Sequence, residues 1–183
     1  VREKARTLGL ATAGRSESQE ICFAADADYA RVVEEIRAGG LPGEGEIVDR
    51  EGAVLGRHGG VHRFTVGQRR GLGVGGTRRL YVTEVDAGRN RVVVGGLDEL
   101  FSAGAEIEGV SWVSGRAPPS PIRALVRVRY RHPGAPARLE LQANGTLRAH
   151  FDEPVRAVAP GQAAVFYDGD VVLGGGWIAG QIP

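Results

Sequence analysis

The 183-residue sequence contains a single cysteine, Cys22, and no methionine. One cysteine excludes an intrachain disulfide and any zinc site built from several cysteines. A complete gene product begins with methionine, whereas this chain begins with Val1. We therefore expect the sequence to be a fragment or a processed chain.

Long apolar runs are also missing from the sequence. No segment approaches the roughly 18 apolar residues of a membrane-spanning helix, and no signal-peptide pattern is present. We therefore expect a soluble, cytoplasmic protein with no membrane partner. No metal site is expected either, because the histidines show no metal-ligand spacing with the cysteine. The histidines are His58, His62, His132 and His150.

Lysine is nearly absent, since Lys4 is the only lysine among 23 basic residues. The net charge is only +1, but the arginines are concentrated in two bands. Residues 52–83 hold six arginines and no acid, and residues 115–150 hold seven arginines and one acid, Glu140. Arginine pairs bidentately with phosphate and stacks on bases, so both bands fit a nucleic-acid surface. Genomic base composition and solvated strand faces are the alternative explanation.

Glycine is abundant, with 29 residues, and indicates many tight turns between short strands. Residues 1–8 predict the end of a helix that stops at Gly9, and an apolar stripe at helical spacing predicts a second helix over about 27–38. The other segments alternate apolar and polar residues between turns. Strands are predicted over 46–49, 53–57, 61–67, 79–86, 90–95, 105–114, 122–132, 137–143, 146–152, 155–158, 162–167, 171–173 and 177–182.

This pattern predicts a mainly β protein, with a small central β domain carrying one helix, followed by an antiparallel β-barrel. The predicted central domain is 25–102 and the predicted barrel is 103–183. Along residues 122–130, apolar residues that include Tyr130 alternate with arginines. One face of this strand is expected in the core, and the other is expected to form a basic stripe.

One glycine-rich segment, Gly71–Gly76, matches the G-x-G-x-x-G pattern of dinucleotide sites. Such a site needs a helix directly after the glycines, so that the helix N-terminus meets the pyrophosphate. The residues that follow, Arg78–Asp86, have the pattern of a strand. The motif is therefore rejected, and no cofactor is expected on this chain.

Cys22 follows a polar loop and is flanked by Ile21 and Phe23. A lone cysteine is often a small buried core residue. The functional alternative is a nucleophile or sulfur carrier, which requires an accessible thiolate with a lowered pKa. The residue pattern around Cys22 leaves both interpretations open.

Five segments carry more specific residue patterns. They are ESQEICF (17–23), LPGEGEIVDREGAVLGRHGGVHRFTVGQRRGLGVGG (41–76), the Tyr81-Val82 strand, RVRYRH (127–132) and FDEPVRAVAPGQAAVFYDGDVVLGGGWI (151–178). Together they resemble the bacterial tRNA-specific 2-thiouridylases. The resemblance covers essentially all 183 residues, but only the C-terminal half of the family. The chain departs slightly from the family at Glu17, where an Asp is common.

The resemblance implies an enzyme that installs sulfur on the wobble uridine of tRNA. ATP would be bound by an N-terminal ATP-pyrophosphatase domain that this chain lacks, and residues 1–24 would be the tail of that domain with the cysteine loop. Cys22 would carry the sulfur as a persulfide, received from a sulfur-relay protein or a cysteine desulfurase. A second cysteine lies in the N-terminal domain of the family, so the isolated chain is expected to be inactive.

The resemblance also implies tRNA contacts at Arg129, Tyr130 and Gln162. The loop Gln68-Arg69-Arg70, which has no nearby acids, is a weaker candidate for the same role. Structural alternatives remain for these residues, with Tyr130 in the core, Gln162 as a turn residue and the loop as a structural element.

Two rival interpretations compete with the 2-thiouridylase assignment. One is a free-standing RNA-binding β-barrel module without catalysis. The other is a two-chain enzyme in which a separate protein supplies the ATP chemistry. A reading frame that extends upstream into an SGGxDS-type phosphate loop would favour the single-chain enzyme over both.

Overall fold

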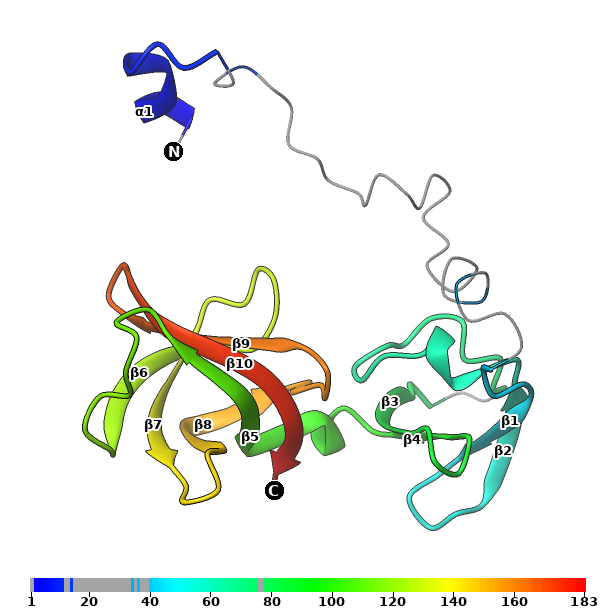
Figure 1. The fold of residues 1–183 in the computed structure, drawn as a ribbon. Helices are drawn as coiled ribbons and strands as arrows, with labels where there is room; N and C mark the ends of the chain where they lie inside the picture. The colour runs from blue at the N-terminus through cyan, green and yellow to red at the C-terminus, as the bar shows by residue number, and fades with distance from the viewer. Residues whose placement is uncertain (1, 12–13, 15–33, 35, 37–39, 76–77) are drawn as a thin grey trace. The chain divides into compact units, whose positions relative to one another are not determined.

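The computed structural model describes residues 2–11, 14, 34, 36, 40–75 and 78–183 (Figure 1). The chain divides into two compact units, residues 1–41 and 42–183. In the first unit, helix α1 (Arg2–Thr7) ends two residues before Gly9, the predicted stop, whose φ of 66° is readily adopted by glycine. Of the helix predicted over 27–38, the structure describes only residues 34 and 36, both of them helical. Cys22 lies outside the described residues.

The second unit begins with a four-stranded sheet in the order β2-β1-β4-β3. Strands β1 and β4 pair in parallel, and the other neighbours are antiparallel. The sheet buries a cluster of valines and isoleucine against Val61 and Leu72. The elements of this region are β1 (Gly45–Val48), β2 (Val54–His58), the 3₁₀ turn η1 (Val61–Arg63), β3 (Tyr81–Asp86), β4 (Arg91–Gly95) and η2 (Asp98–Leu100).

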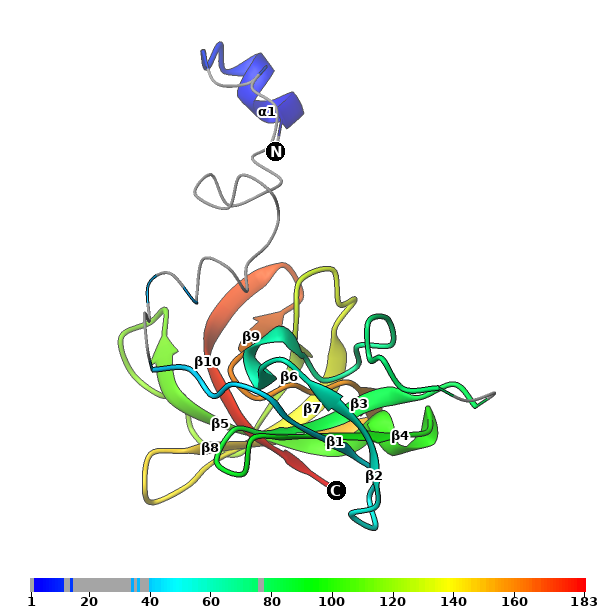
Figure 2. The same cartoon turned by 90° about the vertical axis from the view of Figure 1, so that its right-hand side faces the viewer.

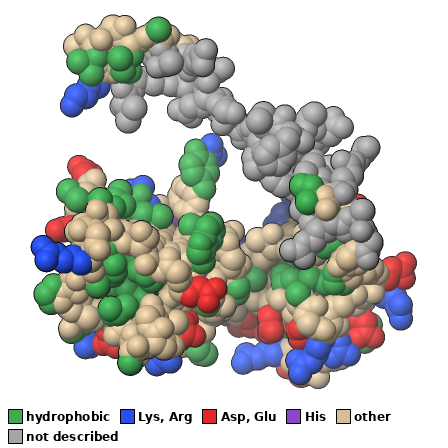
Figure 3. All heavy atoms as spheres, in the orientation of Figure 1, with side chains coloured by type: hydrophobic (Ala, Val, Ile, Leu, Met, Phe, Trp, Pro, Cys, Tyr) green, Lys and Arg blue, Asp and Glu red, His purple; other side chains and the backbone are tan. Residues whose placement is uncertain are grey.

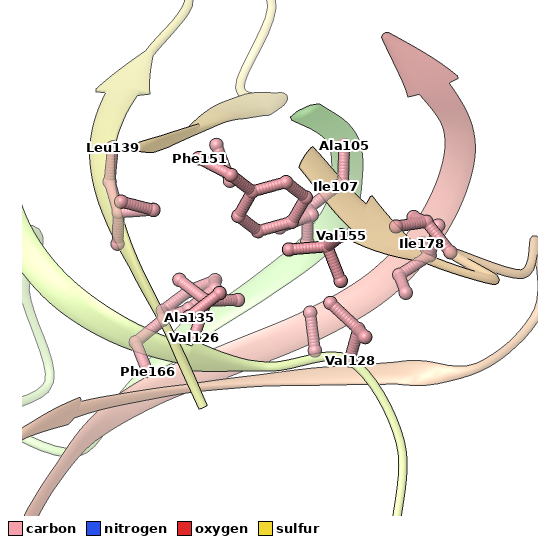
Figure 4. Close-up of a cluster of buried hydrophobic side chains, with 14 of the residues drawn as sticks. Ala105, Ile107, Val126, Val128, Ala135, Leu139, Phe151, Val155, Phe166 and Ile178 are labelled. Atoms are coloured by element: carbon pink, nitrogen blue, oxygen red, sulfur yellow. The ribbon is translucent and has the colours of Figure 1, made fainter. Parts of the chain in front are cut away.

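Six further strands close into an antiparallel barrel in the order β10-β5-β8-β7-β6-β9 (Figures 1 and 2). They are β5 (Phe101–Trp112), β6 (Ile122–Arg127), β7 (Ala135–Leu141), β8 (Leu147–Arg156), β9 (Ala163–Asp168) and β10 (Val171–Ile182). Every second residue points inward, and the interior is filled by side chains such as Leu139, Phe151 and Phe166 (Figure 4). The predicted fold class, mainly β with a small sheet followed by a barrel, is confirmed.

The glycine run in β10 has a steric cause. A Cβ at Gly175 would lie 2.7 Å from the Ala164 carbonyl oxygen, and one at Gly176 would lie 2.6 Å from that of Glu108. Both neighbouring strands therefore approach β10 more closely than any side chain allows. The run lies inside one continuous strand, so the prediction of two strands, 171–173 and 177–182, is wrong.

Two other strand predictions are corrected. Residues 61–67 form no strand, because the Gly60 N–H donates to His58 Nδ1 at 3.0 Å and the chain turns into η1 instead. Strand β8 is continuous over the predicted break between 152 and 155. Its pairing with β5 shifts register between Ser102 and Gly104, and Pro154 lies in that irregular part of β8, away from the regular ladder.

No helix among the described residues is long and apolar enough to cross a membrane. The barrel begins at Phe101, close to the predicted boundary between the central domain and the barrel. The division into domains 1–24, 25–102 and 103–183 remains a prediction.

The barrel core predicts a large effect for one substitution. Phe166 is fully buried and packs against Trp112 with a centroid distance of 5.7 Å. Phe166→Ala removes these contacts and leaves a cavity, so we expect it to lower the free energy of unfolding by about 3–5 kcal/mol. Phe101, which is 47% exposed, is the matched control. Urea denaturation checks both variants, and equal losses for Phe166→Ala and Phe101→Ala would contradict this assignment of the core.

Candidate nucleic-acid interface

Strand pairing brings the predicted tRNA contacts to one end of the barrel. Strands β6 and β9 are antiparallel, with Val126 opposite Phe166 and Arg127 opposite Val165. The end of β6 therefore lies beside the start of β9. Arg129 and Tyr130 lie two and three residues after the end of β6, and Gln162 directly precedes β9, so residues far apart in the sequence share one end of the strand pair.

The strand predicted over 122–132 ends early, at Arg127. The inward alternation continues only to Val128, which is fully buried. The chain then turns, with φ of 61° at Arg131 and 104° at Gly134, and the Gly134 N–H donates to His132 Nδ1 at 3.1 Å. Tyr130, which the alternation placed on the core side, is 84% exposed. The core alternative for Tyr130 is therefore wrong.

Gln162 is a turn residue and also carries an unused polar atom. Its N–H donates to the Ala159 carbonyl at 3.2 Å, and its own carbonyl accepts the Ile178 N–H at 2.8 Å. Its side-chain Oε1 is buried and has no hydrogen-bond partner among the described residues. A buried acceptor without a partner is unfavourable, and this one lies in the turn that leads into β9.

The loop around Gln68 supports the structural alternative for that residue. Its Oε1 accepts the Thr65 N–H at 3.1 Å, and its Nε2 donates to the Arg70 carbonyl at 3.0 Å. The Gln68 amide is thus used within the loop, whereas the side chains of Arg69 and Arg70 are exposed. A Cβ on Gly67 would lie 2.9 Å from the Ala157 Cβ, so the loop adjoins the β8–β9 connection that leads to Gln162.

Several arginines of the second basic band form ion pairs with carboxylates, between strands or within one strand. Arg123 forms a bidentate pair with Asp152, with a 2.8 Å contact between Nη1 and Oδ1. This hydrogen bonding lowers the pKa of the Asp152 carboxyl and raises that of Arg123. Arg138 lies 2.8 Å from Glu140, and Arg148 lies 3.7 Å from Glu106. We call Arg123, Arg138 and Arg148 the paired arginines.

Four other arginines form no ion pair with any described carboxylate, and we call them the rim arginines: Arg127, Arg129, Arg131 and Arg156. Uncharged groups hold them instead. The guanidinium of Arg127 lies 4.7 Å from the Tyr167 ring centroid, and those of Arg131 and Arg156 lie 5.3 Å from the Tyr130 and Tyr81 centroids. Arg129 Nη1 donates to the Arg156 carbonyl at 2.9 Å.

The rim arginines suit phosphate binding, because a guanidinium held by a ring or a carbonyl retains its full charge and its remaining N–H donors. Sequence reasoning missed Arg156, because it lies in the acidic C-terminal segment. The high arginine content of residues 115–150 also does not distinguish the rim arginines from the paired arginines.

His132 lies beside the rim arginines. Burial lowers its pKa first, and the charges of Arg129 and Arg127 lower it further. The ring is therefore neutral at pH 7, and Nδ1 is free to accept the Gly134 N–H.

The described residues show neither a phosphate loop nor a cluster of metal-ligating side chains. The segment Gly71–Gly75 is followed by strand β3 rather than a helix, so it lacks the geometry of a phosphate loop. No group of three or more metal-ligating side chains gathers in the described part of the chain. No step that uses ATP is assigned to these residues.

Comparison with known proteins identifies two family models and several close relatives. Residues 102–178 match the aminomethyltransferase beta-barrel domain, and residues 37–96 match the tRNA methyl transferase PRC-barrel domain. The tRNA-specific 2-thiouridylase of Solibacter usitatus is 49% identical over 97% of this chain and 50% of its own length. That of Geobacter metallireducens is 48% identical over 97% of this chain and 48% of its length. The chain thus spans about half the length of these relatives.

The position of His132 predicts a pH dependence of stability. The pKa of His132 in the folded protein lies below the unfolded value of 6.5. Between these two pKa values, the unfolded chain therefore binds more protons than the folded protein. The stabilisation is fully present above pH 6.5 and falls as the pH drops toward the folded pKa. Melting curves between pH 7.5 and 5 are expected to show a smaller loss for His132→Gln than for wild type. An identical pH slope in the variant would contradict this role.

Proposed function

The chain belongs to the tRNA-specific 2-thiouridylases, and on this premise we propose that it forms the C-terminal half of such an enzyme, which holds the tRNA and carries the sulfur. The observation that carries the proposal is the set of rim arginines. They are charged and fixed in place, and they adjoin Tyr130 and Gln162 at one end of the barrel.

The proposed interface combines three recognition chemistries. The rim arginines bind phosphates of the tRNA backbone. Tyr130, exposed and flanked by Arg131, presents a ring on which an unpaired base can stack. Gln162 offers an amide oxygen that has no partner among the described residues. The exposed Arg69 and Arg70 extend the basic surface from the adjoining loop, and Gln68 shapes that loop.

Cys22 is proposed to carry the sulfur as a persulfide, on the strength of the family resemblance. The terminal sulfur attacks C2 of a wobble uridine that ATP has activated in the domain missing from this chain, and the activating group leaves with its electron pair. The thiol of a second cysteine, in that domain, then attacks the Cys22 sulfur. The sulfur–sulfur bond breaks, sulfur stays on C2, and the two cysteines form a disulfide that an external thiol must reduce.

The substrate and partners follow from the same proposal. The wobble uridine lies in an anticodon loop, where unstacking a base costs less than in a duplex. Cys22 receives its sulfur from a relay protein or a cysteine desulfurase. The ATP-pyrophosphatase domain completes the enzyme, and the isolated chain is expected to bind tRNA without thiolating it.

A free-standing RNA-binding barrel is the alternative function. The same rim arginines support RNA binding in both cases, so the barrel itself does not separate the two functions. The chemistry of Cys22 separates them, because only the enzyme half requires this cysteine to accept sulfur. The two-chain enzyme differs from both in requiring a separate protein that restores thiolation when added.

The rim arginines predict a charge effect that depends on position. Arg129→Ala with Arg131→Ala should weaken tRNA binding and reduce the salt slope of log K by about 0.7–0.9 for each phosphate that the protein no longer neutralises. The control, Arg123→Ala with Arg148→Ala, removes the same charge from the paired arginines and should leave the slope nearly unchanged. Filter binding at several salt concentrations measures both. Equal effects of the two double variants, or no binding at low salt, would rule out this interface.

The proposed role of Cys22 predicts that the chain accepts sulfur covalently. Incubation of the chain with a cysteine desulfurase and cysteine should add one sulfur atom, detected by intact mass, which dithiothreitol removes. Cys22→Ser should gain none. The proposal fails if the serine variant gains as much sulfur as the wild type.

A further inference from the structure

Trp177 is a large aromatic side chain on the outer surface of the barrel. It is 57% exposed, whereas the next residue, Ile178, is 1% exposed and belongs to the core. This alternation along β10 directs the indole away from the interior. The other tryptophan, Trp112, packs against Phe166 instead. The barrel core therefore does not account for an indole at position 177.

The surface beside Trp177 is an open groove of about 420 Å³. Glycines 174–176 and the alanines of β9 line it, and the close strand approach described above keeps side chains off the glycines. Figure 3 shows hydrophobic side chains gathered on the barrel, in the orientation of Figure 1. Val113, Val165 and Val172 also line the groove, so the exposed indole lies next to a mainly apolar surface.

Strand register connects this groove to the rim arginines. Trp177 pairs with Ala163, the residue after Gln162, and the Gln162 carbonyl accepts the Ile178 N–H at 2.8 Å. Arg127 pairs with Val165, which pairs in turn with Gly175. Directly paired residues share a face of the sheet, so Arg127 and the groove floor lie on one outer surface. Two strand spacings, about 10 Å, separate Arg127 from Gly175 of the groove.

Resting on the proposed function, we propose that Trp177 and the groove floor form a stacking site for one unpaired nucleobase of the bound tRNA, whose phosphates lie on the rim arginines. Stacking needs no base-edge contact, so the site accepts any base. Glu108, exposed and paired with Trp177 from the β5 side, repels phosphate and so directs the RNA backbone toward the arginines. The closed barrel leaves no free edge for strand addition by a second copy.

Variants at Trp177 test the stacking site. Trp177→Ala should weaken tRNA binding about tenfold with an unchanged salt slope, because stacking involves no counterion release. Trp177→Phe keeps an aromatic face and should retain most of the affinity. Val171→Ala, an exposed position at the hairpin end of β10, is the control and should bind like the wild type.

Fluorescence supplies a second measurement. The signal of Trp177 is the difference between the wild-type and Trp177→Phe spectra, and it should be quenched as tRNA saturates the protein. An unpaired RNA oligonucleotide should quench it too, and a fully paired duplex should not.

The outcomes separate this inference from the function on which it rests. One outcome is that Trp177→Ala binds tRNA like the wild type, tRNA leaves the Trp177 fluorescence signal unchanged, and the Arg129/Arg131 variant binds weakly. In that case the stacking site is wrong and the proposed function stands. If the arginine variant also binds like the wild type, the tRNA interface itself is wrong. A Trp177 signal that changes with protein concentration in the absence of RNA would overturn the proposal in favour of self-association.

Discussion

The pairing of β9 with both β6 and β10 is the constraint on which the candidate interface depends. It closes the barrel and gathers an outer surface from three separate stretches of chain. The register carries Arg127 to one side of β9 and Trp177 to the other, and it leaves Gln162 at the strand's beginning. A one-residue slip in either pairing would turn these side chains toward the interior. The core and the proposed interface therefore share the same hydrogen-bond ladder.

Charge pairing divides the basic band into two groups with different roles. The ion pairs of the paired arginines add little stability, since exposed ion pairs are typically worth less than about 1 kcal/mol. The rim arginines lack a carboxylate partner among the described residues, and the tyrosine rings and one carbonyl orient them. Because these orienting groups carry no negative charge, the surface around the rim arginines keeps a positive potential that attracts the RNA backbone. Two arginines of the same strand, Arg123 and Arg127 of β6, thus belong to different sets, the paired and the rim arginines.

The proposed function separates the holding of RNA from the chemistry of sulfur transfer. Phosphate contacts and stacking positions are built on a rigid closed barrel, which suits the recognition of a large substrate. Cys22 precedes both the sheet and the barrel in the sequence, so no strand of either contains it. In the proposed function, Cys22 meets a sulfur donor and then the uridine while the barrel holds the tRNA.

Local pattern alone determined the mainly β fold, most strand positions and the rejection of a dinucleotide site, because alternation and turn residues act within a few positions. The order of residues also carried the family resemblance. Only the tertiary structure decided that Tyr130 is exposed, that Gln68 serves its own loop and that Arg156 joins the rim. It alone separated the rim arginines from the paired ones and placed Trp177 beside Gln162. These features arise from contacts between distant segments, whose partners no local pattern specifies.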